Sequence, residues 1–236
     1  MNKAAPRTLV VIPAYNEEGN IEAIVRAVHA EAPPAQVVVV DDGSRDRTAR
    51  AARAAGAVVV SLPQNMGYGV ALQTGYKYAL RNGFDRIVQM DADGQHDPAG
   101  IAGLLAALDA GADIAVGSRF LGSCEYRIPF ARKAGMVLFA AIGTLLMGRR
   151  VTDPTSGFIA LNRRALRRVC SDRFPGDYPD VDVLLMLHFS GLRVVEAPVV
   201  MRASRSSRSM HRGVLGPLYY VFKMSLSILV TCLRRY

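Results

Sequence analysis

The sequence reads RIVQMDADGQH from Arg86 to His96. Residues 86–90 are mostly apolar and have the length of a buried strand, and two aspartates follow directly. Side chains two positions apart in an extended segment point to the same side. Asp91 and Asp93 are therefore expected to converge on one point beyond the end of the strand.

Two converging carboxylates repel each other unless a cation lies between them. A hard divalent cation, Mg²⁺ or Mn²⁺, suits oxygen ligands and is usually completed by water and by phosphate oxygens of a substrate. This pair therefore favours chemistry on a phosphorylated substrate. An Asp-x-Asp pair on its own is more often an ordinary polar loop, so the neighbouring motifs decide between the two interpretations.

Apolar segments alternate with amphipathic ones through the first half of the chain. The expected strands cover residues 8–12, 36–40, 58–62, 86–90 and 113–117, and the expected helices cover 21–28, 45–55, 68–81 and 98–110, with Ser44 as an N-cap. Repeated β-α-β units predict an α/β fold with a mostly parallel sheet and helices on both faces. The polar loops 14–18, 41–44 and 91–93 then meet at the carboxyl ends of the strands.

The second half is less regular and more basic. Helices are expected over residues 134–147, 163–169 and 181–189, and strands over 158–161 and 192–201. Residues 1–120 hold 11 Lys and Arg against 13 Asp and Glu, whereas residues 121–236 hold 18 against 7. The second half is therefore expected to face an anionic partner, such as a phosphorylated ligand or anionic lipid.

Composition excludes several classes of protein. With 50% hydrophobic residues the chain is not generally disordered. Its three cysteines are far apart, so a disulfide framework or a zinc site is not expected, and residues 1–7 lack the apolar core of a signal peptide. Nucleic acid is not an expected partner, because the basic tract 202–212 lacks interleaved aromatic residues.

Several motifs together resemble glycosyltransferase family 2, and within it the polyprenyl-phosphate branch that includes dolichol-phosphate mannosyltransferase. The matching segments are PAYNEE (13–18), VDDGS (40–44), NMGYG (65–69), DADGQH (91–96), GSRF (117–120) and TDPTSGF (152–158). The resemblance runs from about residue 8 to about residue 212. It implies a GT-A (Rossmann-like) fold, a nucleotide-sugar donor, a divalent metal and inversion at the anomeric carbon.

The resemblance also divides the chain. Residues 1–212 would form the glycosyltransferase domain, with a nucleotide-binding half over about 8–120 and an acceptor half over about 121–212. Residues 213–236 would form an apolar, membrane-associated C-terminal helix.

Donor and metal ligands follow from the same resemblance. The nucleotide pocket would be lined by Pro13, Tyr15, Glu17, Asp42 and Gly67, with a GDP- or UDP-sugar as the donor. Glu17 is alternatively a helix N-terminal charge and Gly67 a simple turn. Asp91, Asp93 and Gln95 would hold Mg²⁺ or Mn²⁺, with Asp91 and Asp93 also counted as catalytic because the metal stabilises the leaving diphosphate. We expect His96 to be structural or to support the metal ligands.

The acceptor determines whether a general base is needed, because a lipid phosphate is already ionised whereas a sugar hydroxyl must lose a proton. By resemblance Asp153 is the third catalytic candidate, as a base or as an orienting group, and it is alternatively a turn carboxylate. Asp180 and Asp182 are further candidates, and both alternatively favour a helix N-terminus. Arg119, Arg132 and Arg208 are the candidate phosphate contacts, because guanidinium groups match phosphate oxygens.

Membrane contact is expected at the C-terminus. Residues 214–233 reach the length of a spanning helix, but Lys223 near the middle is costly in a bilayer and the flanks are basic on both sides. We therefore favour a helix that lies on the membrane surface over one that spans it. Residues 134–147 touch either lipid or the core, and an integral-membrane partner or a homo-oligomer stays open.

Three hypotheses for the function follow. The first is an inverting, metal-dependent transfer of sugar from a nucleotide-sugar to a polyprenyl phosphate, at the cytoplasmic face of the cell membrane by a peripheral enzyme. The second is the same chemistry with a hydroxyl acceptor in polysaccharide or glycolipid synthesis. The third, from another class, is an inert basic membrane-binding module, against which the intact Asp91 and Asp93 pair argues.

Overall fold

The computed structural model describes residues 5–172, 174–175, 179–204 and 215–234, and these ranges contain seven strands and eight helices. The strands are β1 (Thr8–Ala14), β2 (Gln36–Asp41), β3 (Val58–Ser61), β4 (Arg86–Gln89), β5 (Ile114–Cys124), β6 (Ile159–Asn162) and β7 (Val194–Met201). The helices are α1 (Ile21–Glu31), α2 (Thr48–Ala54), α3 (Tyr68–Arg81), α4 (Gly100–Asp109), α5 (Phe130–Met147), α6 (Arg163–Val169), α7 (Val181–Phe189) and α8 (Leu215–Leu233).

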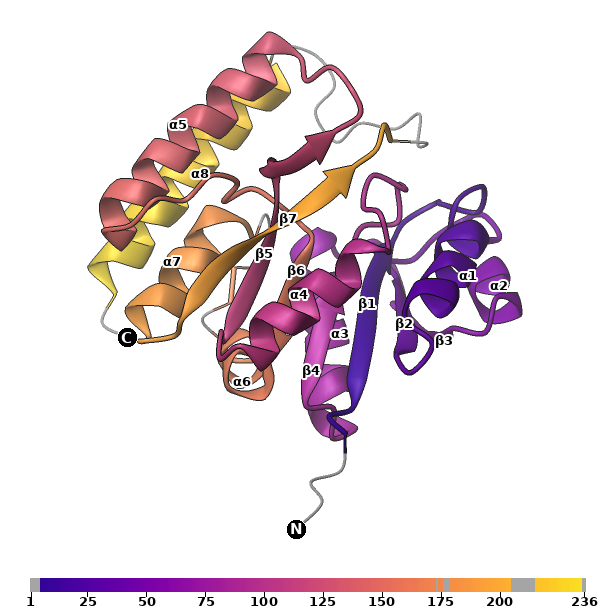
Figure 1. Cartoon of the computed structure of the whole chain (residues 1–236). Helices are drawn as coiled ribbons and strands as arrows, with labels where there is room; N and C mark the ends of the chain where they lie inside the picture. Colours follow the sequence, from indigo (N-terminus) through magenta and orange to yellow (C-terminus); the bar gives the residue numbers. More distant parts are fainter. Residues whose placement is uncertain (1–4, 173, 176–178, 205–214, 235–236) are drawn as a thin grey trace.

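Within the described residues the strands form one sheet in the order β3-β2-β1-β4-β6-β5-β7. Neighbouring strands run parallel except at β6, which is antiparallel to both β4 and β5. The chain therefore has the α/β fold with a mostly parallel sheet that the sequence predicts, and the sheet includes strands from both halves (Figure 1).

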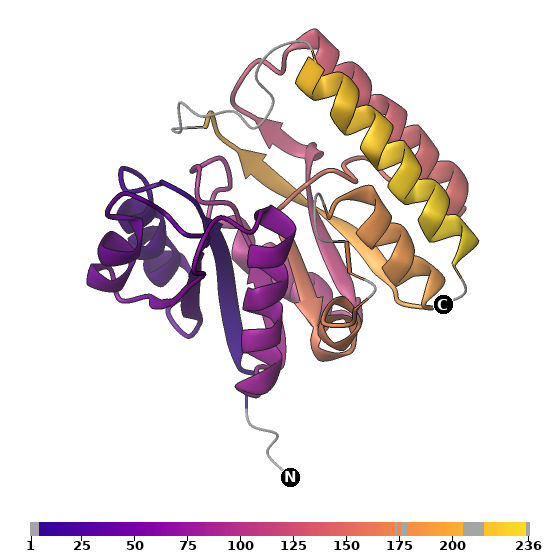
Figure 2. The ribbon, with the colours of Figure 1, turned by 180° about the vertical axis from the view of Figure 1, so that it is seen from behind.

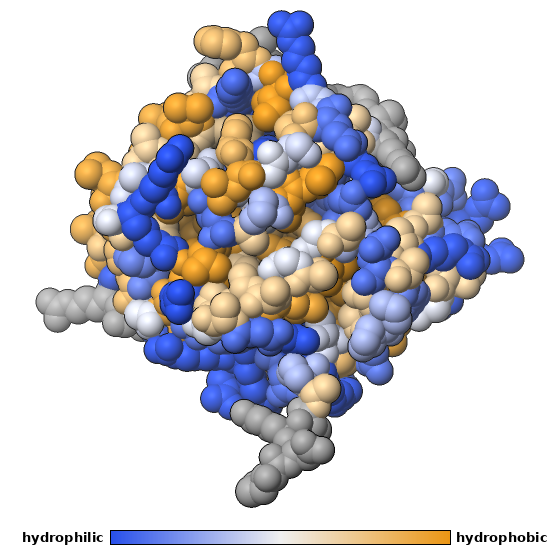
Figure 3. Space-filling model, viewed as in Figure 1, coloured by the Kyte–Doolittle hydropathy of each residue, from blue (hydrophilic) through white to orange (hydrophobic). Residues whose placement is uncertain are grey.

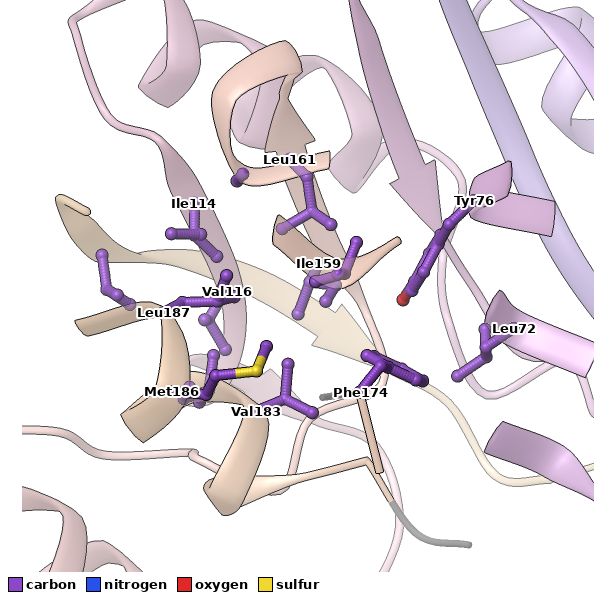
Figure 4. Packing of buried hydrophobic residues seen from close by; sticks show 14 of the residues in the cluster. Leu72, Tyr76, Ile114, Val116, Ile159, Leu161, Phe174, Val183, Met186 and Leu187 are labelled. Atoms are coloured by element: carbon purple, nitrogen blue, oxygen red, sulfur yellow. The ribbon is translucent and has the colours of Figure 1, made fainter. Parts of the chain in front are cut away.

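Alternating side chains of the strands fill a core on each face of the sheet. In β1, Leu9 and Val11 belong to the core under α3, α6 and α7, while Val10 and Ile12 belong to the core under α1, α2 and α4. Figure 4 shows part of the first core, where Leu161 and Ile159 of β6 lie between Tyr76 of α3 and the α7 side chains. This strict alternation explains why the strands read as continuous apolar runs, because both faces are covered.

Several expected boundaries differ from the structure, and helix α5 begins at Phe130 and not at residue 134. The helix after β2 begins at Thr48 and not at residue 45, because the Asp46 carboxylate accepts the Thr48 amide at 2.9 Å, while the Ser44 hydroxyl accepts the Asn16 amide instead of capping a helix. The strand expected to end at residue 117 continues to Cys124, where it pairs with β7 beyond an irregularity in register.

The C-terminal helix α8 packs on α7 and runs beside α5 (Figures 1 and 2). Its Met224 and Ile228 are buried in the core, and Ser227 donates a hydrogen bond to the buried Asp182 of α7. Across the residues that the structure describes, we find no helix whose length and hydropathy would carry it through a membrane.

Candidate active site

The polar loops of the first half gather at one edge of the sheet, where the parallel strands end. Ala14 of β1 lies opposite Asp41 of β2, and Val11 of β1 lies opposite Gln89 of β4. The Asp42 amide donates to the Ala14 carbonyl at 2.9 Å, which holds the first two loops together. The expected convergence of the β1, β2 and β4 ends is confirmed.

Asp42 ties the loop before α3 to the end of β2. Its two carboxylate oxygens accept the Met66 amide at 2.7 Å and the Gly67 amide at 3.0 Å. Gly67 has φ +97°, a backbone conformation that L side chains rarely adopt, so glycine is required at this turn. The neighbouring Asp41 accepts the Ser44 amide at 3.1 Å and so caps the turn, as its position in the loop suggests.

The loop after β1 presents an aromatic ring and a carboxylate. Tyr15 is 41% exposed, whereas Pro13 is buried within the sheet beside Val40. The Glu17 amide donates to the Thr48 hydroxyl at 2.8 Å, and its carboxylate accepts the Asn20 side-chain amide at 2.8 Å. These contacts fix the loop and leave the Tyr15 ring accessible.

Asp91 lies at the end of β4, and the groups in contact with it are neutral. Its Oδ1 accepts the Tyr68 hydroxyl at 2.8 Å, and its Oδ2 lies 3.7 Å from the His96 ring. Although 31% of its side chain is exposed, the surrounding protein raises the pKa of Asp91, and the Tyr68 hydroxyl and the charges of Arg119 and Arg132 oppose that shift. Tyr68 is not among the residues expected from the sequence, where its only signal is its place inside the NMGYG motif.

Asp93 lies close enough to Asp91 for the two charges to interact. Burial raises the pKa of Asp93, the Asp91 charge raises it further, and the Gln95 amide, which donates to Asp93 at 2.9 Å, lowers it. The Gln95 carbonyl accepts the Arg202 amide at 2.8 Å, which attaches this turn to the end of β7. Two carboxylates are thus held near each other in a place where negative charge is unfavourable.

His96 supports the backbone of the same turn. Its Nδ1 accepts the Asp91 amide at 3.0 Å, and its ring stacks on Phe158 with centroids 5.0 Å apart. Burial lowers the pKa of His96 to about 4, so the ring is neutral at physiological pH. These contacts hold the backbone at Asp91, and the expectation that His96 is structural or supports the metal ligands stays a prediction.

The donor set at the end of β4 fits a hard divalent cation better than a soft one. Among the described residues no three His, Cys, Asp or Glu side chains group as a complete metal cage. Two carboxylates of raised pKa with neutral contacts are nonetheless what Mg²⁺ or Mn²⁺ uses when substrate phosphates and water complete the shell. The residues present therefore fit such an ion, with the side chain of Gln95 next in the turn.

Asp153 and Arg119 form a buried ion pair beside this site. Asp153 Oδ2 accepts Arg119 Nε at 2.6 Å, and the side chains of both residues are enclosed, with Asp153 0% exposed. Burial alone would lower the pKa of Arg119, but Asp153 and Tyr126 outweigh burial and raise it. Burial raises the pKa of Asp153 and the Arg119 charge opposes that rise. The structure thus places Asp153 inside an ion pair and not at an open surface.

The loop that carries Asp153 is held in turn by β7. The Glu196 carboxylate accepts the Asp153 amide at 2.7 Å and the Thr152 amide at 2.8 Å. The Thr152 hydroxyl contacts Ser118 at 2.7 Å, next to Arg119. This network holds the Arg119 guanidinium against Asp153 and the Tyr126 hydroxyl.

The remaining candidates are placed differently. Arg132 is exposed in the first turn of α5, and its charge is near enough to lower the pKa of Asp91. Arg208 lies outside the described residues. Asp182 is buried on α7, where it bonds Ser227 and two amides of its own turn, while Asp180 is near enough to raise the pKa of Tyr68.

The sequence of this chain matches a known protein family. The profile of glycosyl transferase family 2 matches residues 9–170 of this chain. The chain belongs to this family. It is a glycosyltransferase of the hexosyltransferase type, in agreement with the resemblance found in its motifs.

Relatives of this family-2 glycosyltransferase include two with assigned activities. It is 35% identical over 202 residues to polyprenol monophosphomannose synthase from Mycolicibacterium smegmatis, covering 82% of this chain and 76% of that one. It is 31% identical over 219 residues to undecaprenyl-phosphate mannosyltransferase from Micrococcus luteus, covering 89% and 90% of the two chains.

A solved structure shares the fold. Glucosyl-3-phosphoglycerate synthase from Mycobacterium tuberculosis, in complex with Mn²⁺, UDP-glucose and phosphoglyceric acid, matches with a TM-score of 0.76 at 23% identity. The match covers 98% of this chain and 81% of that one. At this identity the likeness establishes the GT-A type of fold for the chain.

Proposed function

We propose that this glycosyltransferase moves a hexose, with inversion, from a nucleotide-sugar donor to a polyprenyl phosphate at the cytoplasmic surface of the cell membrane. The names of the two relatives support a lipid-phosphate acceptor. The observation that carries the proposal is the pair of carboxylates at the end of β4, since the groups that contact Asp91 are neutral. Such a pair suits a reaction in which a diphosphate leaves.

In this proposal Asp91 and Asp93 hold Mg²⁺ or Mn²⁺ with the help of Gln95. When bound, the ion would stabilise the negative charge that grows on the departing diphosphate. The raised pKa values of both carboxylates support this role, because a cation between them removes the repulsion that raises the pKa of Asp93. The Mn²⁺ in the complex of the structurally similar synthase supports the same choice of metal.

The donor nucleotide would lie over the ends of β1 and β2. The exposed Tyr15 ring offers a surface for the base, and Glu17 supplies a carboxylate for base or ribose hydroxyls. Asp42 acts mainly through the loop, because both its oxygens accept amides of residues 66 and 67. Gly67 then keeps that loop close to the strand ends, and the buried Pro13 shapes the strand below it.

The acceptor phosphate would be bound by the exposed Arg132 and attracted by the charge of the enclosed Arg119, and it would need no general base. Arg119 and Arg132 both influence Asp91 electrostatically, so their charges lie on its side of the site. Asp153 acts in this proposal by holding Arg119, because an enclosed carboxylate in an ion pair is not placed to take a proton from an acceptor. This observation favours an ionised phosphate over a hydroxyl acceptor.

The exposed apolar side chains of α5 and α8 would rest on the membrane. These side chains are Phe130, Val137, Leu138 and Leu145 on α5 and Phe222, Leu226, Leu229, Val230 and Leu233 on α8. Figure 2 shows the two helices side by side, and Figure 3 shows apolar side chains gathered in the region where Figure 1 places α5. Peripheral attachment through these side chains would bring a lipid acceptor to the adjacent site.

The test of the function is a two-acceptor assay. The full chain is incubated with Mn²⁺ and with labelled GDP- or UDP-hexoses, using either undecaprenyl phosphate in detergent or soluble sugars as the acceptor. The proposal predicts that label enters the organic phase only with the lipid phosphate. Equal or greater transfer to sugar hydroxyls supports the second hypothesis, and no transfer with any donor supports the inert module.

The membrane contact is tested by substitution and not by truncation, because removing α8 would uncover the core around Met224 and Ile228. The Leu226→Ser and Leu229→Ser double variant changes exposed residues only. We expect it to sediment less with anionic lipid vesicles than wild type while keeping its thermal stability. Unchanged sedimentation would show that these side chains are not the membrane contact.

A further inference from the structure

A buried chain of hydrogen bonds ends on Asp91. The Tyr76 hydroxyl donates to Gln89 Oε1, Gln89 Nε2 donates to the Tyr68 oxygen at 3.1 Å, and the Tyr68 hydroxyl donates to Asp91 Oδ1 at 2.8 Å. Tyr76 and Gln89 are fully enclosed in the core under α3. This series of hydrogen bonds therefore links a rigid part of the protein to Asp91, the carboxylate that the proposed function assigns to the metal.

The direction of this chain follows from the chemistry of its members. An ionised carboxylate only accepts hydrogen bonds, so Tyr68 must donate to Asp91. The Tyr68 oxygen is then free to accept the Gln89 amide, and the carbonyl of that amide is left to accept from Tyr76. In each hydrogen bond of the series, the acceptor is the partner nearer to Asp91 along the series.

The Tyr76 end of this series of hydrogen bonds is held in place by packing. Tyr68 and Tyr76 are both on α3, two turns apart and so on the same face, while Gln89 is the last residue of β4. The Tyr76 ring meets Phe174 edge-on, with centroids 5.6 Å apart and an angle of 87° between the rings. Figure 4 shows this ring among the buried side chains that fix it.

The other sides of the Asp91 carboxylate are also bounded. A Cβ atom built on Gly157 would lie 2.9 Å from Asp91 Oδ2 and 3.3 Å from the Tyr68 hydroxyl oxygen. The His96 ring lies 3.7 Å from the same Oδ2. Glycine at position 157 thus leaves room for the carboxylate in the one orientation that the Tyr68 bond selects.

We infer that Tyr68 is a positioning residue, which acts through Asp91 by holding its carboxylate in the orientation that binds a divalent cation. Groups that hydrogen-bond a metal ligand orient it, and their loss commonly weakens metal binding about 10- to 100-fold. The inference rests on the proposed function, since it takes Asp91 as a metal ligand. It adds two requirements for metal binding, namely the Tyr68 hydroxyl and a glycine at position 157.

The test measures metal binding without donor or acceptor, by the loss of the free Mn²⁺ signal in electron paramagnetic resonance. Tyr68→Phe removes the hydroxyl and keeps the ring, and we expect the Mn²⁺ Kd to rise about tenfold or more. The matched control is Tyr78→Phe on the same helix, whose hydroxyl is outside the chain to Asp91, and its Kd should equal that of wild type. In activity assays Tyr68→Phe should raise the Mn²⁺ concentration for half-maximal rate while kcat at saturating Mn²⁺ stays near wild type.

A second variant perturbs the Asp91 carboxylate without removing a polar group. Gly157→Ala crowds the carboxylate, and because its φ lies outside the left-handed region the backbone itself accepts alanine. We expect weaker Mn²⁺ binding here too, with circular dichroism like that of wild type. Wild-type Kd values in both Tyr68→Phe and Gly157→Ala would overturn the inference even if Asp91→Asn abolishes binding. Unchanged binding in Asp91→Asn itself would overturn both the inference and the metal site of the proposed function.

Discussion

Two carboxylates of this enzyme, Asp91 and Asp153, lie beside the same site but differ in the charge of their contacts. Asp91 is bonded by the Tyr68 hydroxyl and approached by the neutral His96 ring. Asp153 is bonded by the Arg119 guanidinium at 2.6 Å. The groups that contact Asp91 are neutral, whereas the group that contacts Asp153 carries a full positive charge.

The charge of its contacts indicates the role of a carboxylate near a site. A buried charge with neutral partners is unfavourable until a cation arrives, so such a carboxylate is suited to bind one. A buried charge inside an ion pair contributes to the local structure, because removing either partner leaves the other uncompensated. We therefore expect substitutions of Asp91 to change chemistry and substitutions of Asp153 to change stability.

The largest expected effect on activity comes from Asp91→Asn. Removing one of two carboxylates that would stabilise the leaving diphosphate is expected to lower kcat by about 100-fold or more. Thermal stability should be equal to or above that of wild type, because burial penalises the Asp91 charge. Initial rates of sugar transfer and a thermal melt of the same preparation test both parts.

The matched control is Asp109→Asn, which breaks an exposed ion pair with Arg86 away from the site. It should retain the wild-type rate and most of its stability, since exposed pairs contribute at most about 1 kcal/mol. A normal rate in Asp91→Asn would remove the distinction between the two carboxylates.

The largest expected effect on stability comes from Asp153→Asn. It leaves the buried Arg119 without a counter-charge, which is expected to cost about 3 kcal/mol or more of unfolding free energy. Urea denaturation of the variant measures this loss. If Asp153 is a general base instead, kcat falls and the urea midpoint does not move.

A double variant sharpens the same prediction. Arg119→Met combined with Asp153→Asn removes both charges, and it should recover much of the lost stability. If the Arg119 charge attracts the acceptor phosphate as proposed, this stable protein should still transfer sugar poorly, with a raised KM for the lipid phosphate.

The sequence predicts the framework of the site well and its internal contacts poorly. The strands around residues 8–12, 36–40 and 86–90 are found because both faces of the sheet are buried, which gives unbroken apolar runs. The turn at Gly67 is signalled by its glycines, and the positive φ agrees. Such local patterns predict structure well, because the residues that carry the pattern are the same residues that form the strand or turn.

Contacts between distant residues give no such pattern. Tyr68 lies 23 residues from Asp91, and Arg119 lies 34 residues from Asp153, so neither bond can be derived from local spacing. The burial of Asp182 against Ser227 depends on where α8 packs, which the apolar run of residues 214–233 does not reveal. For the same reason the side of α8 that faces the core could not be separated from the side that is exposed.

The smallest expected effect concerns Asp182, a third carboxylate that differs from both. It is 2% exposed and accepts the Ser227 hydroxyl, and burial raises its pKa while that hydroxyl opposes the rise. In the unfolded chain the group ionises near its ordinary pKa of about 3.9. Between that value and the raised pKa the folded state binds more protons, so wild-type stability falls as pH rises through this window.

Asp182→Asn keeps the hydrogen-bonding shape and removes this titration. We expect the variant to be at least as stable as wild type near neutral pH, with the difference shrinking toward about pH 4. Urea midpoints across that range measure it. A variant whose deficit in stability grows as the pH rises would mean that the Asp182 charge stabilises the start of α7.

The central claim is that Asp91 and Asp93 together bind a divalent cation. It is tested most directly by titrating Mn²⁺ into the full chain and into the Asp91→Asn and Asp93→Asn double variant, and by following free Mn²⁺ by electron paramagnetic resonance. The account predicts one site per chain in wild type, strengthened by a nucleoside diphosphate, and no comparable site in the double variant. The same stoichiometry and affinity in both proteins would contradict it.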